Sequence, residues 1–263
     1  MIDINEKEEL AALLPEVVTL ARAAGQVVME IYGELNPAVE YKSDHSPLTQ
    51  ADLVSHHTIE KGLLRLAPNW PVLSEESKEI PFEQRKSWEY FWLVDPIDGT
   101  KEFLKRSGEF TINIALMERS APILGVVFAP VIDKLYYGAR GAGCWLADRG
   151  QISQIRTARS GNGKTRVVVS RSHGSSEEDI GRFTGDAANC EFVSMGSSLK
   201  FCLVAEGVAD VYPRIGPTME WDTAAAQCLV EEAGGTVTDL EGNPMYYNKP
   251  NLLNPGFIAK GRR

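Results

Sequence analysis

Residues 94 to 100 read VDPIDGT and place two carboxylates, Asp95 and Asp98, three positions apart after an apolar stretch. Pro96 fixes its own φ angle and has no N–H, so the chain after Asp95 is stiff. The next carbonyl, that of Ile97, is then free to turn toward a metal ion instead of joining a strand ladder. The stretch is therefore a candidate metal site, although Asp-Gly is also a common turn dipeptide.

The last two residues of this stretch, Gly99 and Thr100, favour the binding of an anion. Gly99 has no side chain, so a phosphate can approach the backbone closely. Thr100 is expected to begin a helix, whose first N–H groups would be free to hold that phosphate. One short segment thus predicts a template for both metal and phosphate.

Four further acidic residues lie after apolar strands or at helix starts: Asp52, Glu75, Glu76 and Asp222. Such positions point side chains into the crevice where α/β proteins bind ligands. Gathered together, the carboxylates would repel one another unless hard cations lay between them. Oxygen-only ligation suits Mg²⁺ or Mn²⁺, and the absence of nearby His and Cys argues against zinc.

Each of these residues alone has a structural alternative. Asp52 follows Thr49 by three positions, which is the spacing of a capping box, and Asp222 could be a helix N-cap. Glu75 and Glu76 could be solvated loop charges. The combination is what favours a site.

The elements that would position these residues differ between the two halves of the chain. The first half predicts two helices, over about 6–32 with a break allowed at Pro15 and from Thr49 onward. Strands follow over 71–74, 90–95, 111–117, 121–130 and 134–139, and turn residues cluster over 141–153. This strand-rich pattern indicates an α+β half.

After a connection at 160–164, strands and helices alternate, which is typical of an α/β half. The strands are expected over 166–170, 191–195, 209–213 and 236–239, and the helices near 176–183, 198–206 and 223–233. We expect two domains, over 1–160 and 161–263.

Composition narrows the class of protein. The 263 residues include 43% hydrophobic ones and carry a net charge of −9, so attraction to nucleic acid or to an anionic membrane is not expected. The four cysteines are widely spaced among apolar residues, which predicts buried free thiols in a reducing cytosol. The N-terminus does not look like a signal peptide, and no apolar run approaches the ~20 residues of a membrane span.

Three segments carry a family resemblance: SEE at 74–76, DPIDGT at 95–100 and WDTAAA at 221–226. In order and spacing they resemble the inositol monophosphatase superfamily of Mg²⁺-dependent, lithium-sensitive phosphatases. Within it, SPLTQAD (46–52), VVSRSH (168–173) and GSSLKFCLVAEGVADVYPR (196–214) are similar to the bacterial CysQ type, a 3'(2'),5'-bisphosphate nucleotidase. The resemblance implies a layered αβαβα sandwich of the inositol monophosphatase/fructose-1,6-bisphosphatase type. Residues 1–160 would carry most metal ligands, and 161–263 would carry Asp222 and the substrate-selecting residues.

The resemblance also implies roles for individual residues. One Mg²⁺ would be held by Glu75, Asp95 and the Ile97 carbonyl, a second by Asp95, Asp98 and Asp222, and a third, weaker one near Glu75. Thr100, hydrogen-bonded to Asp52, would orient or deprotonate the water that attacks the phosphate in line, without a phosphoenzyme. Glu75 also counts as catalytic, whereas Glu76 would only support the metal shell.

Substrate choice would depend on the second half. Lys200, in GSSLK, would meet a second phosphate, Ser170 and His173 would lie beside the nucleoside, and Arg214 would add positive charge. The remaining expected substrate contacts are Glu75, Ile97, Asp98, Gly99, Thr100 and Asp222, with Arg171 and Lys101 as further candidates. Lys200 could instead be a solvated helix lysine, and His173 a loop or capping residue.

The resulting hypothesis is a cytoplasmic, Mg²⁺-dependent phosphatase that removes the 3'-phosphate of adenosine 3',5'-bisphosphate, or of its sulfated parent. It would recycle a by-product of sulfate assimilation. The alternatives are an inositol-1-phosphatase or broad sugar phosphatase, and a non-catalytic nucleotide or metal sensor. The KEF after DPIDGT and Lys200 favour the nucleotidase. No nucleic-acid partner is expected and a membrane contact would be peripheral at most, while oligomeric state does not follow from the sequence.

Overall fold

The structure is a computed structural model that describes residues 7–34, 39–41, 47–158, 163–170, 183 and 187–262. The elements of its first part are α1 (Lys7–Tyr32), β1 (Val39–Tyr41), β2 (Pro47–Thr49), α2 (Gln50–Leu66), β3 (Val72–Ser74), α3 (Phe82–Arg85), β4 (Tyr90–Asp98), α4 (Thr100–Leu104), β5 (Thr111–Glu118), β6 (Ala121–Ala129), β7 (Lys134–Ala139), β8 (Gly143–Asp148) and β9 (Gln151–Ile155). Those of the second part are β10 (Thr165–Ser170), η1 (Ala187–Asn189), β11 (Cys190–Met195), α6 (Leu199–Ala205), β12 (Val211–Arg214), α7 (Glu220–Glu232), β13 (Thr236–Asp239) and β14 (Phe257–Lys260).

Two sheets make up most of the molecule. The seven strands β3 to β9 form one sheet in chain order, in which β3 and β4 are parallel and every later pair is antiparallel. The second sheet has the order β11-β10-β12-β14-β13, with β10 parallel to both of its neighbours. A small β1–β2 pair lies apart from both.

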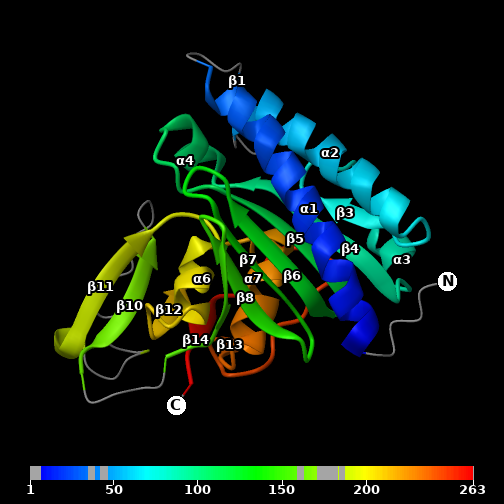
Figure 1. Ribbon diagram of the computed structural model, residues 1–263. Helices are drawn as coiled ribbons and strands as arrows, with labels where there is room; N and C mark the ends of the chain where they lie inside the picture. Colours follow the sequence, from blue (N-terminus) through cyan, green and yellow to red (C-terminus); the bar gives the residue numbers. More distant parts are fainter. Residues whose placement is uncertain are drawn as a thin grey trace.

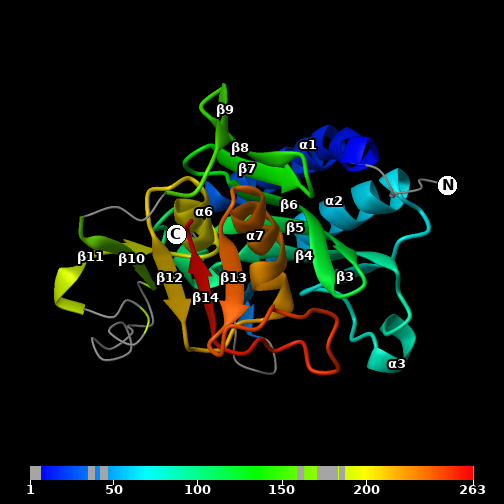
Figure 2. The same cartoon turned by 90° about the horizontal axis from the view of Figure 1, so that it is seen from below.

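Helices cover both faces of the seven-stranded sheet. In Figure 1, α1 and α2 lie across one face, and Figure 2 shows α6 and α7 between this sheet and the five-stranded one. Side chains alternate along β4, so Trp92 and Val94 pack toward α1 and α2 while Phe91 and Leu93 pack toward α6 and α7. Both faces of the strand are therefore buried.

The layers confirm the predicted fold class. The described residues form the helix, sheet, helix and sheet layers in that order. Phe183, which is helical, packs against the outer face of the five-stranded sheet beside Val167 and Ile258. The rest of the helix expected near 176–183 lies outside the described residues.

Helix α7 approaches the seven-stranded sheet unusually closely. A Cβ atom on Gly125 of β6 would lie 2.2 Å from the Ala225 carbonyl oxygen of α7, so only glycine fits there. Because α7 belongs to the second half of the chain but packs on the sheet of the first, the two halves share one core. The division into two domains at residue 160 stays a prediction.

Helix α1 differs from the sequence prediction in two ways. It continues through Pro15, so the break allowed at that position does not occur. By length and composition, the helix Glu8–Tyr32 is also apolar enough to cross a membrane, since an 18-residue window within it has a mean hydropathy of 1.3, contrary to the expectation that no such run exists. A buried core helix meets the same criteria, and the apolar face of α1, including Leu14 and Val17, packs against the sheet.

Other expectations can be compared directly. All four cysteines are buried and free, as predicted. The stretch 141–153, where turn residues cluster, contains the hairpin β8–β9, whose two strands were not predicted. Its two turn residues, Arg149 and Gly150, both have positive φ angles, which is the conformation that closes a tight two-residue hairpin. Strand β14, only four residues long, was not predicted.

Candidate active site

The two carboxylates of VDPIDGT lie on β4, which extends through them instead of ending in a turn. Asp95 pairs with Asn113 of β5, and Asp98 pairs with Thr111, so β4 carries one extra residue between the pairs. Residues three apart on a regular strand point to opposite faces, but this β-bulge returns Asp98 to the face of Asp95. Pro96 is tolerated there because a bulged residue makes no ladder bond.

Glu75 joins these carboxylates because β3 runs parallel to β4. Ser74 pairs with Val94, and the Glu75 N–H donates to the Val94 carbonyl at 3.1 Å. The carboxyl ends of parallel strands meet at the same edge of a sheet, so Glu75 begins its loop beside Asp95. Glu76 lies in the same loop, where its N–H faces the Ser74 hydroxyl at 3.4 Å.

Asp222 comes from the first turn of α7. It is the third residue of the helix, not the N-cap, and its Oδ2 accepts the Met219 N–H at 2.8 Å, in the manner of a capping box. The carboxylates of Asp95, Asp98 and Asp222 each place one oxygen within 4.8 Å of the other two. Asp222 therefore both caps α7 and contributes a carboxylate to the group that it forms with Asp95 and Asp98, which we call the acidic cluster.

The cluster is electrostatically strained without a cation. Burial raises the pKa of Asp95 well above its ordinary value, and the nearby Glu75, Asp98 and Asp222 raise it further. Burial likewise raises the pKa of Asp222, with Asp98 as the next cause. The pKa of Asp98 is also raised by burial, although Lys200 opposes the shift. A site with only oxygen donors and this excess negative charge fits a hard divalent cation.

Asp52 and Thr100 form the predicted dyad. Oδ2 of Asp52 accepts the Thr49 N–H at 2.8 Å and its hydroxyl at 2.6 Å, which caps α2 as the structural alternative proposed. The other oxygen, Oδ1, is 3.3 Å from Thr100 Oγ1, which also lies 3.3 Å from the Ile97 carbonyl oxygen. One carboxylate thus fixes its own helix and faces the threonine.

Gly99 makes this geometry accessible. Its φ angle is +92°, and a Cβ atom on it would lie 3.3 Å from Ser197 Cβ. Thr100 then begins α4, as expected, although this helix has only five residues.

The carboxylates of Asp98 and Asp222 open into a cavity of about 140 Å³. Its lining includes Asp98, Gly99, Lys101, Ser170, Lys200, Arg214 and Asp222. The structure therefore gathers most of the predicted substrate contacts around one space. His173 and Arg171 lie outside the described residues.

Lys200 is not a solvated helix lysine. Its side chain is buried, with 7% of the residue exposed, and its Nζ donates to the Ser197 carbonyl at 2.5 Å and lies 5.6 Å from the centre of the Tyr212 ring. Burial lowers the pKa of Lys200, and Asp98 acts in the opposite direction. Arg214 is held nearby by bonds from its guanidinium to the Gly216 and Pro217 carbonyls, both at 3.2 Å.

Comparison with known proteins places this site in a family. A model of the inositol monophosphatase family matches residues 9–261. The chain belongs to this family. The 3'(2'),5'-bisphosphate nucleotidase CysQ of Salmonella typhimurium is 47% identical over 250 residues, which covers 93% of this chain and 98% of that protein. The protein of the same name from Escherichia coli K12 is 47% identical over 249 residues, with the same coverage.

A crystal structure of CysQ from Bacteroides thetaiotaomicron, described as a bacterial member of the inositol monophosphatase family, superposes with a TM-score of 0.85. It is 37% identical and covers 99% of this chain and 100% of its own. The predicted family and the layered fold are therefore confirmed. The inositol monophosphatase family is metal-dependent, and the acidic cluster supplies groups that could hold a metal.

Two residues of the inositol monophosphatase-like site were not predicted. Ser198, at the start of α6, donates its N–H to Asp98 Oδ2 at 2.6 Å, and its Oγ lies 2.7 Å from both Asp98 Oδ2 and the Asp222 carbonyl. The same Oγ accepts the Nδ2–H of buried Asn113 at 2.8 Å. A single serine thus links Asp98 to the first turn of α7. The sequence contained one indication of these hydrogen bonds, because Asn113 is a polar residue within the apolar strand TINIALM.

Proposed function

We propose that this protein is a Mg²⁺-dependent 3'(2'),5'-bisphosphate nucleotidase that removes the 3'-phosphate of adenosine 3',5'-bisphosphate. The names of its curated relatives support this activity. The structural observation that carries the proposal is one cavity lined both by Asp98 and Asp222 of the acidic cluster and by basic side chains, namely Lys101, Lys200 and Arg214.

A substrate with two phosphates matches this distribution of charge. The scissile phosphate would lie against the metal ions held by the carboxylates, and the second phosphate would contact Lys200 and Arg214. A buried lysine has lost much of its hydration, so its charge is available to an anion at little further cost. Ser170, which lines the cavity, would lie beside the nucleoside, and His173 remains a predicted contact there.

The chain's own groups would do the following. Glu75, Asp95 and the Ile97 carbonyl would hold one Mg²⁺, and Asp98 and Asp222 would complete a second site with Asp95. When bound, these ions neutralise phosphate charge, stabilise the leaving oxygen and make water more acidic.

Thr100 and Asp52 would orient the attacking water. Donation of the Thr100 hydroxyl to Asp52 Oδ1 leaves a Thr100 lone pair that can accept a proton from water. Attack in line with the 3'-oxygen forms the new P–O bond as the ester bond breaks. Asp52 is the final proton acceptor, and the released 3'-oxygen takes a proton from solvent.

In the cell this activity would recycle a by-product of sulfate assimilation, and the sulfated parent nucleotide would be a second substrate. Four buried free thiols suit the reducing cytoplasm that we propose as its location.

The test is phosphate release with Mg²⁺ from four substrates side by side: adenosine 3',5'-bisphosphate, its sulfated parent, inositol 1-phosphate and fructose 1,6-bisphosphate. We expect the highest kcat/KM for an adenosine bisphosphate. A higher kcat/KM for inositol 1-phosphate or fructose 1,6-bisphosphate would replace our assignment with a sugar phosphatase, and binding without turnover would indicate a sensor.

A further inference from the structure

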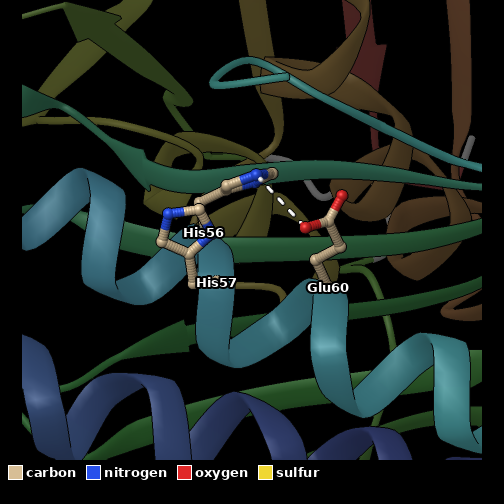
Figure 3. A group of neighbouring side chains, drawn as sticks. All are labelled: His56, His57 and Glu60. Atoms are coloured by element: carbon tan, nitrogen blue, oxygen red, sulfur yellow. Dashed lines mark ion pairs between the residues drawn. The ribbon is translucent and has the colours of Figure 1, made fainter. Parts of the chain in front are cut away.

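A second group of side chains that could hold a metal ion lies on α2, outside the acidic cluster. It consists of His56, His57 and Glu60, and Figure 3 shows both imidazoles and the carboxylate on neighbouring turns of the helix. One donor atom from each lies within 4.8 Å of the other two. Glu60 follows His56 by four positions and His57 by three, and both spacings bring side chains together on a helix surface.

The distance between the His56 and Glu60 side chains fits two ligands of one metal ion better than a direct hydrogen bond. His56 Nε2 is 3.7 Å from Glu60 Oε2, which is beyond hydrogen-bond distance. Zinc binds imidazole nitrogen and carboxylate oxygen at ~2.1 Å, so two such donors in a tetrahedral site stand ~3.4 Å apart. A shift of a few tenths of an ångström would therefore place one ion between them.

His56 is already oriented as a ligand. It is 5% exposed, and its other ring nitrogen, Nδ1, lies 3.0 Å from the Ser74 hydroxyl. In the tautomer with a proton on Nδ1, that N–H donates to Ser74 and the Nε2 lone pair faces Glu60. Metal-bound histidines are commonly held in this way, by a hydrogen bond from the nitrogen that does not bind the metal.

The other two ligands can adjust. His57 is exposed, the side chain of Glu60 is 37% exposed, and the His57 ring centre is 5.0 Å from that of His56. Because both are open to solvent, they can close on an ion without disturbing the core. Water can fill a fourth position.

We propose that His56, His57 and Glu60 form a second metal site, for a divalent transition metal such as Zn²⁺. Two imidazoles and one carboxylate favour Zn²⁺, Co²⁺, Ni²⁺ or Cu²⁺ over Mg²⁺, so this site and the acidic cluster select different ions. The proposal does not depend on the proposed nucleotidase activity.

The test is a calorimetric Zn²⁺ titration of chelator-treated protein made without a polyhistidine tag, in saturating Mg²⁺ to occupy the acidic cluster. We expect one Zn²⁺ per chain, and at least ~10-fold weaker binding after His57→Ala or Glu60→Gln. These two residues are chosen because their exposure spares the fold, whereas His56 is buried. The matched control, Glu30→Gln, removes an exposed carboxylate of α1 and should leave Zn²⁺ affinity unchanged.

A second titration separates the two sites. In an Asp95→Asn background, which disrupts the acidic cluster, the Zn²⁺ site should persist and should weaken on addition of His57→Ala. No Zn²⁺ binding below millimolar concentration would overturn the proposal. So would binding that neither His57→Ala nor Glu60→Gln weakens.

Discussion

The Ser198 hydroxyl is the feature whose removal best tests how the acidic cluster is built. In Ser198→Ala, Asp98 Oδ2 keeps the backbone N–H at 2.6 Å but loses the O–H at 2.7 Å, and the Asn113 amide loses its acceptor. We expect weaker cation binding, because Asp98 is then free to rotate away from the position that faces Asp222.

The magnitude follows from the bond that is lost. A hydrogen bond to a charged group contributes about 1.5–3 kcal/mol, and 1.4 kcal/mol is a factor of ten in affinity. The Mg²⁺ or Mn²⁺ dissociation constant should therefore rise roughly 10- to 100-fold, which is also the usual effect of removing a partner of a metal ligand. Activity should recover at high Mg²⁺, since no proposed ligand has been removed.

Calorimetric Mg²⁺ titration and Mn²⁺ electron paramagnetic resonance measure this affinity without turnover. The matched control is Ser197→Ala, because Ser197 lines the same cavity but its Oγ has no hydrogen-bond partner among the described residues. Circular dichroism and Tm report whether the variant is folded. Unchanged cation affinity in a folded Ser198→Ala protein, or an equal loss in Ser197→Ala, would refute the reasoning.

Three further predictions concern the charges of the cavity. Asp95→Asn should lower kcat about 10³-fold, the equivalent of several kcal/mol, because it removes a proposed metal ligand. It should also raise the Tm of the metal-free protein, because it removes a buried charge that the neighbouring carboxylates repel. Near-normal turnover would show that the assigned metal site is wrong. In a chelator, the free energy of unfolding should fall as pH rises above about 4, because carboxyls with raised pKa values bind protons more tightly in the folded chain than in the unfolded one. Mg²⁺ should therefore raise Tm more at pH 8 than at pH 5 in a thermal melt. An equal rise at both pH values would argue against electrostatic repulsion among the carboxylates of the acidic cluster. Lys200→Ala should raise KM several-fold for the bisphosphate and less for adenosine 3'-monophosphate; equal changes would remove Lys200 from the second-phosphate site.

The sequence predicted the acidic residues better than the way in which the backbone presents them. Local motifs identified Asp95 and Asp98, but their spacing suggested a turn, whereas the structure keeps them on one strand and aligns them with a bulge. A bulge depends on pairing with β5, and no local pattern in VDPIDGT reports that pairing.

Contacts between segments that are distant in the sequence were the second feature that the sequence did not predict. Ser198 links Asp98 with Asn113 and Asp222, which belong to three separate elements, so none of these bonds has a signature in sequence spacing. The start of α7 was also placed three residues late, at Thr223 with Asp222 as a possible N-cap, whereas the helix begins at Glu220. In the folded chain Glu220 is buried and paired with Lys249.

The origin of the acidic cluster in separate elements has a consequence for biosynthesis. Asp52, Glu75, Asp95 and Asp98 leave the ribosome long before Asp222, and α7 must then dock between two sheets before the last carboxylate arrives. A nascent chain therefore cannot assemble the cation site from its first half alone. Cation binding by the complete cluster must therefore follow the docking of α7, and a chain truncated before α7 should not form the complete site.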